Sequence, residues 1–188
     1  DGNAVFRTAL TAERQRPDRP GRGAGMSITF APMAAEDSEA VIDIFNHYIE
    51  NSFAAYPGKR LPLEAFGMLL NMCQGYPSAT ARTETGEVVG FGMLRPYSPI
   101  ASFASTAEVS YFIKPGFTGR GIGKSMLEHL IDGAKMKGIT SILASICSLN
   151  EDSIRFHARN GFVECGRFAG IGLKHGQRFD VVYYQRIL

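Results

Sequence analysis

The sequence has little cysteine, no tryptophan and no long apolar run, and these absences exclude several classes of protein. Its three cysteines, Cys73, Cys147 and Cys165, are odd in number and widely spaced. None belongs to a CxxC pair, so we expect neither a disulfide framework nor a metal site, and predict reduced, mostly buried thiols. No apolar run approaches the roughly 18 residues that span a bilayer, so we expect a cytoplasmic protein without a membrane partner.

The chain also has little net charge, with 20 basic and 18 acidic side chains in 188 residues. Residues 1–25 hold five arginines and three acids, so the excess lies there and residues 26–188 are neutral. Nucleic-acid binding usually needs a basic stripe, so no nucleic-acid partner is expected. The segment 1–25 is rich in Arg, Gly and Pro and lacks the apolar stretch of a secretory signal. It is predicted to be a flexible extension or tag-like arm before a single domain over 26–188.

Apolar residues make up 45% of the chain and recur at helix and strand spacing, which predicts a packed domain. Strands are predicted over 27–33, 78–82, 88–94, 106–114, 140–147, 162–168 and 179–187. Helices are predicted over 35–50, 63–73, 121–137 and 152–160. The stretch 95–105, with two prolines, is predicted to be a loop. Hairpins mixed with a crossover helix indicate an α/β (α+β mixed) fold: a central mixed, mostly antiparallel sheet of about six to seven strands with helices on both faces.

The most informative segment is a glycine-rich turn between the predicted strand 106–114 and helix 121–137. It carries four glycines within 116–123. A turn of this kind lets backbone amides close around a phosphate, and the helix dipole favours the negative charge. Strand, turn and helix in this order therefore indicate phosphate binding rather than a flexible linker.

Two common phosphate-binding motifs do not match this turn. A Walker A loop would end in Gly123-Lys124-Ser125, but its first required glycine falls on Thr118, and the next strand has no acid for magnesium. A dinucleotide fingerprint would need a different glycine spacing from Gly119-x-Gly121-x-Gly123. A nucleotide hydrolase and a Rossmann enzyme are therefore disfavoured.

The turn instead resembles the pyrophosphate cradle of the GNAT acetyltransferases, over Thr118-Gly119-Arg120-Gly121-Ile122-Gly123. Thr118 stands where that family usually has Gln or Arg. Further segments, in the right order, are similar to phosphinothricin-type amino-acid N-acetyltransferases within this superfamily. They are 46–52, 106–110, 150–162, and 172–176 followed by Asp180. The resemblance covers about residues 27–188.

The resemblance implies acetyl-CoA as the cosubstrate and suggests where it binds. Residues 118–124 would hold the pyrophosphate, with Arg120 and Lys124 beside the backbone amides. The strand residues Tyr111, Phe112 and Ile113 would pair with the pantetheine amides through their backbone. Asn150 and Ser153 would hydrogen-bond the pantetheine arm, although either residue is also suited to cap a helix.

Acetyl transfer to an amine needs a base and a proton for the departing thiolate. Glu108 is the candidate general base, because a carboxylate inside a β-rich run must face water, a partner or a cleft. The resemblance places His157 where many GNAT enzymes have a proton-donating Tyr, and imidazole can exchange a proton near neutral pH. The alternatives are a solvated Glu108 and a packing histidine at position 157.

The acceptor is expected to be a small, amino-acid-like primary amine, with direct transfer because no cysteine occupies a motif position. Similar enzymes carry Trp followed by Arg or Lys before the glutamate strand, whereas this chain has Tyr97-Ser98 there. Arg95 and Tyr97 are therefore the candidate substrate residues. A polyamine, an antibiotic or a protein N-terminus is an alternative acceptor, and a non-catalytic acyl-CoA-binding module is an alternative function. Family habit suggests a homodimer.

Overall fold

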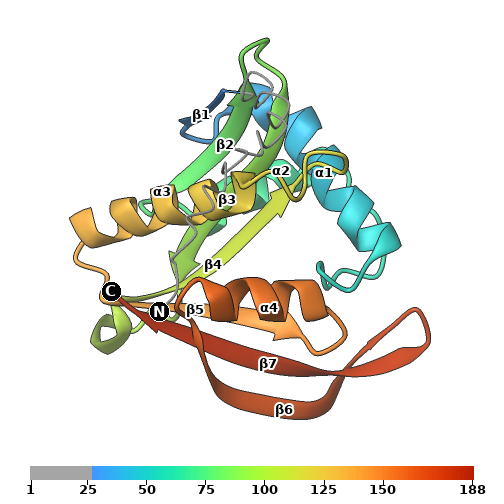
Figure 1. The fold of residues 1–188 in the computed structure, drawn as a ribbon, viewed down its shortest axis with the longest axis vertical. Helices are drawn as coiled ribbons and strands as arrows, with labels where there is room; N and C mark the ends of the chain where they lie inside the picture. The colour runs from blue at the N-terminus through green and yellow to red at the C-terminus, as the bar shows by residue number, and fades with distance from the viewer. Residues whose placement is uncertain (1–26) are drawn as a thin grey trace, which may run out of the picture.

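The structure, a computed structural model, describes residues 27–188, so the predicted arm over 1–25 lies outside the described residues. A single seven-stranded sheet runs through them in the order β1-β2-β3-β4-β5-β7-β6 (Figure 1). The strands are β1 Ile28–Ala31, β2 Ser78–Thr83, β3 Val88–Pro96, β4 Thr106–Ile113, β5 Ser141–Cys147, β6 Val163–Lys174 and β7 Gln177–Ile187. Each neighbouring pair is antiparallel except β4 and β5, which run parallel. The predicted mixed, mostly antiparallel sheet is confirmed.

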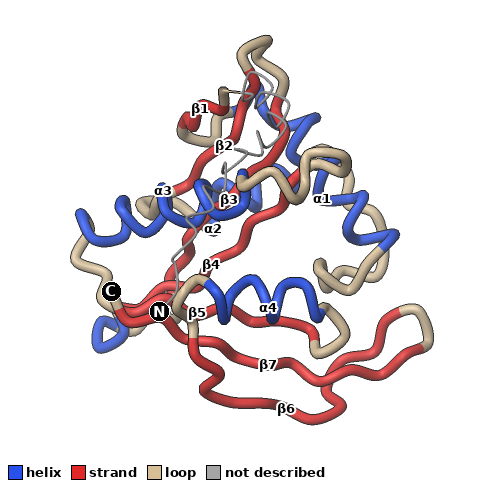
Figure 2. Tube along the Cα trace, viewed as in Figure 1, coloured by secondary structure: helices blue, strands red, loops and turns tan. Residues whose placement is uncertain are grey.

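Helices cover both faces of this sheet, as predicted (Figure 2). They are α1 Ser38–Asn51, α2 Ala65–Met72, α3 Ile122–Met136 and α4 Glu151–Arg159. The apolar stripe of α3, centred on Met126 and Leu130, packs with Ala107, Val109 and other residues of one sheet face. The helices α1 and α2 pack on the opposite face around Phe91. Residues at helical spacing therefore form two buried layers, one on each side of the sheet.

Four strands, β2, β3, β6 and β7, are longer than predicted, and the extensions of β3 and β6 bear on the site. β3 continues through Arg95 and Pro96, which pair with Glu108 and Ala107, so the prediction that Arg95 lies in a loop is wrong. The two prolines concealed this pairing, because proline usually ends a strand. β6 continues to Lys174, past a register shift between Phe168 and Gly172. The predicted strand ends at residue 168, whereas the chain forms a bulge there and continues as one arm of a long hairpin.

The feature that positions the site is the separation of β4 from β5. The two parallel strands pair only over Thr106–Glu108 and Ser141–Leu143, although they continue to Ile113 and Cys147. At the far end of β4, the Ile113 carbonyl accepts a hydrogen bond of 2.6 Å from the Tyr48 hydroxyl of α1. The β5-facing edge of residues 109–113 is thus left without a strand partner among the described residues.

Candidate active site

A cleft of about 810 Å³ opens where β4 and β5 separate. Its two sides are formed by Val109–Ile113 of β4 and Ala144–Ile146 of β5. One end is bounded by the glycine turn and by α4, and the other by Tyr48 and Ser52 at the end of α1. The cleft therefore leads from the start of two helices, through the gap in the sheet, toward the opposite face.

The glycine turn has the backbone conformation that glycine alone adopts readily. Gly116, Gly119 and Gly121 have φ angles of 84°, 74° and 85°, and Gly121 is the N-cap residue of α3. L-residues other than glycine are strained in this region. The first N–H groups of α3 have no partner inside the helix, so the turn offers several backbone donors at the positive end of the helix dipole.

The structure brings most of the predicted cofactor residues of this turn to the cleft. Thr118, Gly119, Gly121, Gly123 and Lys124 line it. Two others can contribute only in part. The Arg120 guanidinium lies over the Phe117 ring, with 5.2 Å between its Cζ and the ring centroid. The Ile122 side chain is buried in the core, so only its backbone is available.

The remaining cofactor residues also line the cleft, from β4 and α4. Phe112 directs its ring to the opposite sheet face, where it stacks on Phe91, so it offers the cleft its backbone. Asn150 caps α4, because its Oδ1 accepts a 3.2 Å hydrogen bond from the Ser153 N–H. Asn150 and Ser153 nevertheless both border the cleft, so the capping role and contact with a ligand are compatible.

Glu108 lies at the last paired position of β4, one residue before Val109, and does not itself line the cleft. The residue is only 7% exposed, and its carboxylate forms an ion pair with Arg95, its cross-strand neighbour. Burial raises the pKa of the Glu108 carboxyl, and the positive charge of Arg95 opposes that rise. A desolvated carboxylate with a raised pKa is suited to accept a proton.

His157 is buried against Tyr111. The ring is 5% exposed, with Nδ1 2.8 Å from the Ser153 carbonyl oxygen and Nε2 2.8 Å from the Tyr111 hydroxyl. A carbonyl only accepts, so Nδ1 must donate to it, and Nε2 then accepts from the hydroxyl. Burial lowers the pKa of His157 and raises that of Tyr111. His157 is therefore a neutral imidazole that accepts a hydrogen bond from the neutral phenol of Tyr111.

The second candidate substrate residue, Tyr97, lies outside this group. It is 45% exposed after β3 and packs edge-on against Phe103, with 5.5 Å between ring centroids. A different tyrosine, Tyr56, contacts β5: its hydroxyl is 3.1 Å from the Ser145 Oγ. Sequence reasoning missed Tyr56 because it lies in an irregular segment without periodicity, and Ser145 because it interrupts an otherwise apolar strand only once.

The three cysteines differ in their exposure to solvent. Cys73 and Cys147 are buried, whereas Cys165 is exposed, because β6 is an edge strand whose side chains mostly face solvent. Within residues 27–188, no cluster of three His, Cys, Asp or Glu side chains is suited to a metal ion. In the same residues, no helix is both long and apolar enough to cross a membrane.

Residues 41–162 match the model of the acetyltransferase (GNAT) family. The chain belongs to this family. It is 30% identical to phosphinothricin N-acetyltransferase of Streptomyces coelicolor, over 84% of this chain and 94% of that protein. It is 31% identical to the L-methionine sulfoximine/L-methionine sulfone acetyltransferase of Salmonella typhimurium, over 85% and 93% of the two chains.

A solved structure supports the same assignment for this GNAT acetyltransferase. The phosphinothricin acetyltransferase of Sinorhizobium meliloti, in complex with acetyl-CoA, superposes with a TM-score of 0.82 at 26% identity. The match covers 87% of this chain and 89% of that one. The resemblance inferred from the glycine turn is thereby confirmed at the level of family, fold and enzyme class.

Proposed function

We propose that this GNAT acetyltransferase transfers the acetyl group of acetyl-CoA directly to the primary amine of a small, amino-acid-like substrate. Bound acetyl-CoA supplies an activated acyl thioester. Residues 118–124 are suited to its phosphates, because the turn combines unpaired helix N–H groups with Lys124. The unpaired edge of residues 111–113, with Asn150 and Ser153, is suited to the amides of its pantetheine arm.

The observation that carries the proposal is the buried Glu108 carboxylate at the point where the two strands separate. An alkylammonium has a pKa of about 10.4, so most of an amine substrate arrives protonated and unreactive at neutral pH. Glu108 removes that proton, directly or through one water molecule, and burial strengthens it as a base by raising its pKa.

His157 has a more limited part in this proposal. Its Nε2 faces the Tyr111 hydroxyl, so a proton from His157 could reach the thiolate only through that hydroxyl. The lowered pKa of His157 and the raised pKa of Tyr111 both oppose this transfer. We therefore assign His157 a smaller contribution to turnover than Glu108.

Arg95 is the proposed cation for the carboxylate of an amino-acid-like acceptor. Its guanidinium has five N–H donors, so the ion pair with Glu108 leaves others available. Arg95 would thus orient the base and the substrate together, with Tyr97 further out. The amino-acid derivatives named for the relatives from Streptomyces and Salmonella support this substrate class.

Direct transfer is supported by the lining of the cleft, in which residues 27–188 place no cysteine to carry an acyl group.

We also propose a cytoplasmic homodimer. The exposed apolar side chains of β6 support an interface there: Val163, Phe168, Ile171 and Leu173. Light scattering in solution tests this part, with a dimer mass expected and a monomer mass contradicting it.

The decisive experiment is thiol release from acetyl-CoA across a panel of amines. The panel contains phosphinothricin, methionine sulfone, proteinogenic amino acids, polyamines, an aminoglycoside and short peptides. The fastest release is expected with an amino-acid-like amine. Release only with a polyamine, aminoglycoside or peptide would replace the substrate class, and acetyl-CoA binding without release would indicate a non-catalytic module.

A further inference from the structure

The GLKHG segment at 172–176 takes no part in the proposed chemistry, yet it holds an unusual residue. Lys174 is 5% exposed, although lysine is rarely buried without an acidic partner. Among the described residues no carboxylate pairs with it. Its Nζ instead donates to two backbone carbonyls, Ser52 at 2.7 Å and Ala55 at 2.6 Å. Burial lowers the pKa of this ammonium, so placing it here has an energetic cost that the two hydrogen bonds offset.

Both carbonyls belong to residues 52–61, which we call the α1–α2 loop. The tip of the β6–β7 hairpin holds the start of this loop at a second point, because the His175 ring packs edge-on against Phe53 at 5.9 Å. His175 and Gly176 have φ angles of 49° and 75°, which is the two-residue turn that joins antiparallel strands tightly. Figure 1 shows the hairpin tip and this loop on the same side of the molecule.

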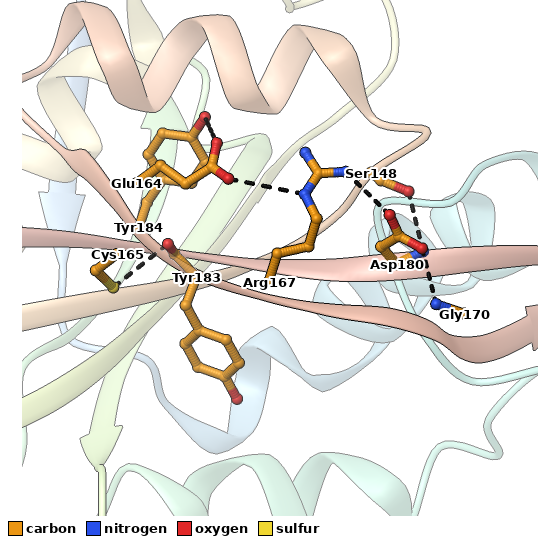
Figure 3. Close-up of polar contacts among 8 residues, drawn as sticks. All are labelled: Ser148, Glu164, Cys165, Arg167, Gly170, Asp180, Tyr183 and Tyr184. Carbon is orange, nitrogen blue, oxygen red and sulfur yellow. Dashed lines mark hydrogen bonds and ion pairs between the residues drawn. The ribbon is translucent and has the colours of Figure 1, made fainter.

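The hairpin that carries Lys174 is held in place at the β6 bulge, between Phe168 and Gly172. Asp180 accepts a 2.8 Å hydrogen bond from the Gly170 N–H at the β6 bulge and forms a 2.9 Å ion pair with Arg167 (Figure 3). Its backbone exchanges hydrogen bonds with Ser148 after β5. The far end of the α1–α2 loop is held as well, by two hydrogen bonds between the Asn46 amide and the Leu61 backbone.

Between these anchors the loop presents Tyr56 to the face of the sheet that carries Glu108. Leu143 is the register neighbour of Glu108, and Ser145 lies two residues further along β5, so both point to that face. The Tyr56 hydroxyl meets Ser145, and its ring stacks on Phe179 with 6.0 Å between centroids. Burial is the main cause of the raised pKa of Tyr56, and the charge of Glu108 makes the smallest contribution, after those of Cys147 and Tyr183.

We propose that Tyr56 contacts the acceptor and determines part of its specificity, and that Lys174 is the positioning residue that holds Tyr56 there. This inference rests on the proposed function, since it assigns a wall to the acceptor side of the same site. It accounts for two of the segments that resembled the family, 46–52 and 172–176, as the two supports of one loop. Lys174 acts through the loop and contacts no reacting atom.

The kinetic test compares Lys174→Met, Lys174→Arg and Tyr56→Ala with wild type. Lys174→Met and Tyr56→Ala should each raise the KM for the amine about tenfold, while the KM for acetyl-CoA stays within about twofold. Lys174→Arg, which keeps charge and donors, should recover part of the loss. The double variant Lys174→Met/Tyr56→Ala should be no worse than Tyr56→Ala, because residues acting through one another are not additive. An unchanged amine KM, an equal rise in both KM values, or multiplicative effects in the double variant would overturn the proposal.

A second readout does not depend on activity. The α1–α2 loop contains a tryptic site, Lys59-Arg60, in an exposed stretch. Lys174→Met should speed cleavage after Lys59 about tenfold, because local opening controls proteolysis of a folded chain. Lys135→Met, which removes an exposed lysine of α3, is the matched control and should cleave like wild type. Fragment masses distinguish this cut from cuts in residues 1–25.

The two readouts separate the failure of this inference from that of the proposed function. If no amine is acetylated but Lys174→Met still speeds cleavage, the proposed function fails and the anchoring role of Lys174 stands. If cleavage is unchanged, the anchor is refuted whether or not the wild type is active. If Lys174→Met does not melt cooperatively, Lys174→Arg and Tyr56→Ala decide both tests, and wild-type values in both variants would refute the proposal.

Discussion

The proposed cofactor and acceptor sites are built in different ways. The proposed phosphate-binding part is formed mostly by the backbone of one continuous segment, in which three glycines with positive φ lead into α3. The proposed acceptor site consists of side chains from separate parts of the chain: Arg95 of β3, Glu108 of β4, Tyr56 of the α1–α2 loop and Ser145 of β5. Glycines alone can set the shape of a local backbone turn. The proposed acceptor site instead depends on the packing that brings distant elements together.

This difference separates binding from chemistry and selectivity. Changes in the glycine turn should alter the affinity for acetyl-CoA, and changes around Glu108 should alter turnover or the choice of amine.

The largest effect is expected for Glu108→Gln. Loss of the base should reduce kcat by about 10²–10⁴-fold at pH 7, since general base catalysis typically contributes that much. Glu87→Gln is the matched control, because Glu87 is an exposed partner of Lys114 in an ion pair of 2.6 Å. A kcat for Glu108→Gln within a few-fold of the control would exclude Glu108 as the base.

Gly121→Ala should weaken the binding of acetyl-CoA. A Cβ at Gly121 meets no atom within 4 Å, so the cost arises from the φ of 85° alone. We expect about 1–2 kcal/mol of strain and a rise of about tenfold in the KM for acetyl-CoA as the turn relaxes. Gly86→Ala has the same strain, with a φ of 83° and open space, but lies in the β2–β3 turn. Equal effects of both substitutions on the acetyl-CoA KM would refute the cradle.

Arg95→Met should change the pH dependence of kcat/KM. The positive charge of Arg95 lowers the pKa of Glu108, so its removal raises that pKa further. Because the base must be ionised, the acid limb of the kcat/KM profile should move to higher pH, and Arg95→Lys should move it less. An acid limb that stays in place would show that the ion pair does not tune the base.

The smallest effect on turnover is expected for His157→Gln, a loss of less than about tenfold in kcat. Its clearer consequence is for stability. Burial lowers the pKa of His157 in the folded state, so the unfolded chain binds the proton first as pH falls below about 6.5. The free energy of unfolding should therefore fall between pH 7.5 and 5.5 by more in wild type than in His157→Gln. Urea titrations at the two pH values measure this, and equal losses would contradict it.

The same difference explains what the sequence could predict. Glycine spacing, helix periodicity and the apolar run of β5 are local, so the elements, the fold class and the cradle were predictable. Arg95 was placed in a loop because prolines conceal its pairing with Glu108. Tyr56 and Lys174 carry no local signal, since their roles depend on a hydrogen bond to Ser145 and on a contact across more than 100 residues of chain.

Calorimetric titration of acetyl-CoA into Gly121→Ala and Glu108→Gln tests this division most directly. We expect a Kd about tenfold weaker than wild type for Gly121→Ala, and a Kd within about twofold of wild type for Glu108→Gln. Wild-type affinity in Gly121→Ala, or a comparable loss of affinity in Glu108→Gln, would contradict it.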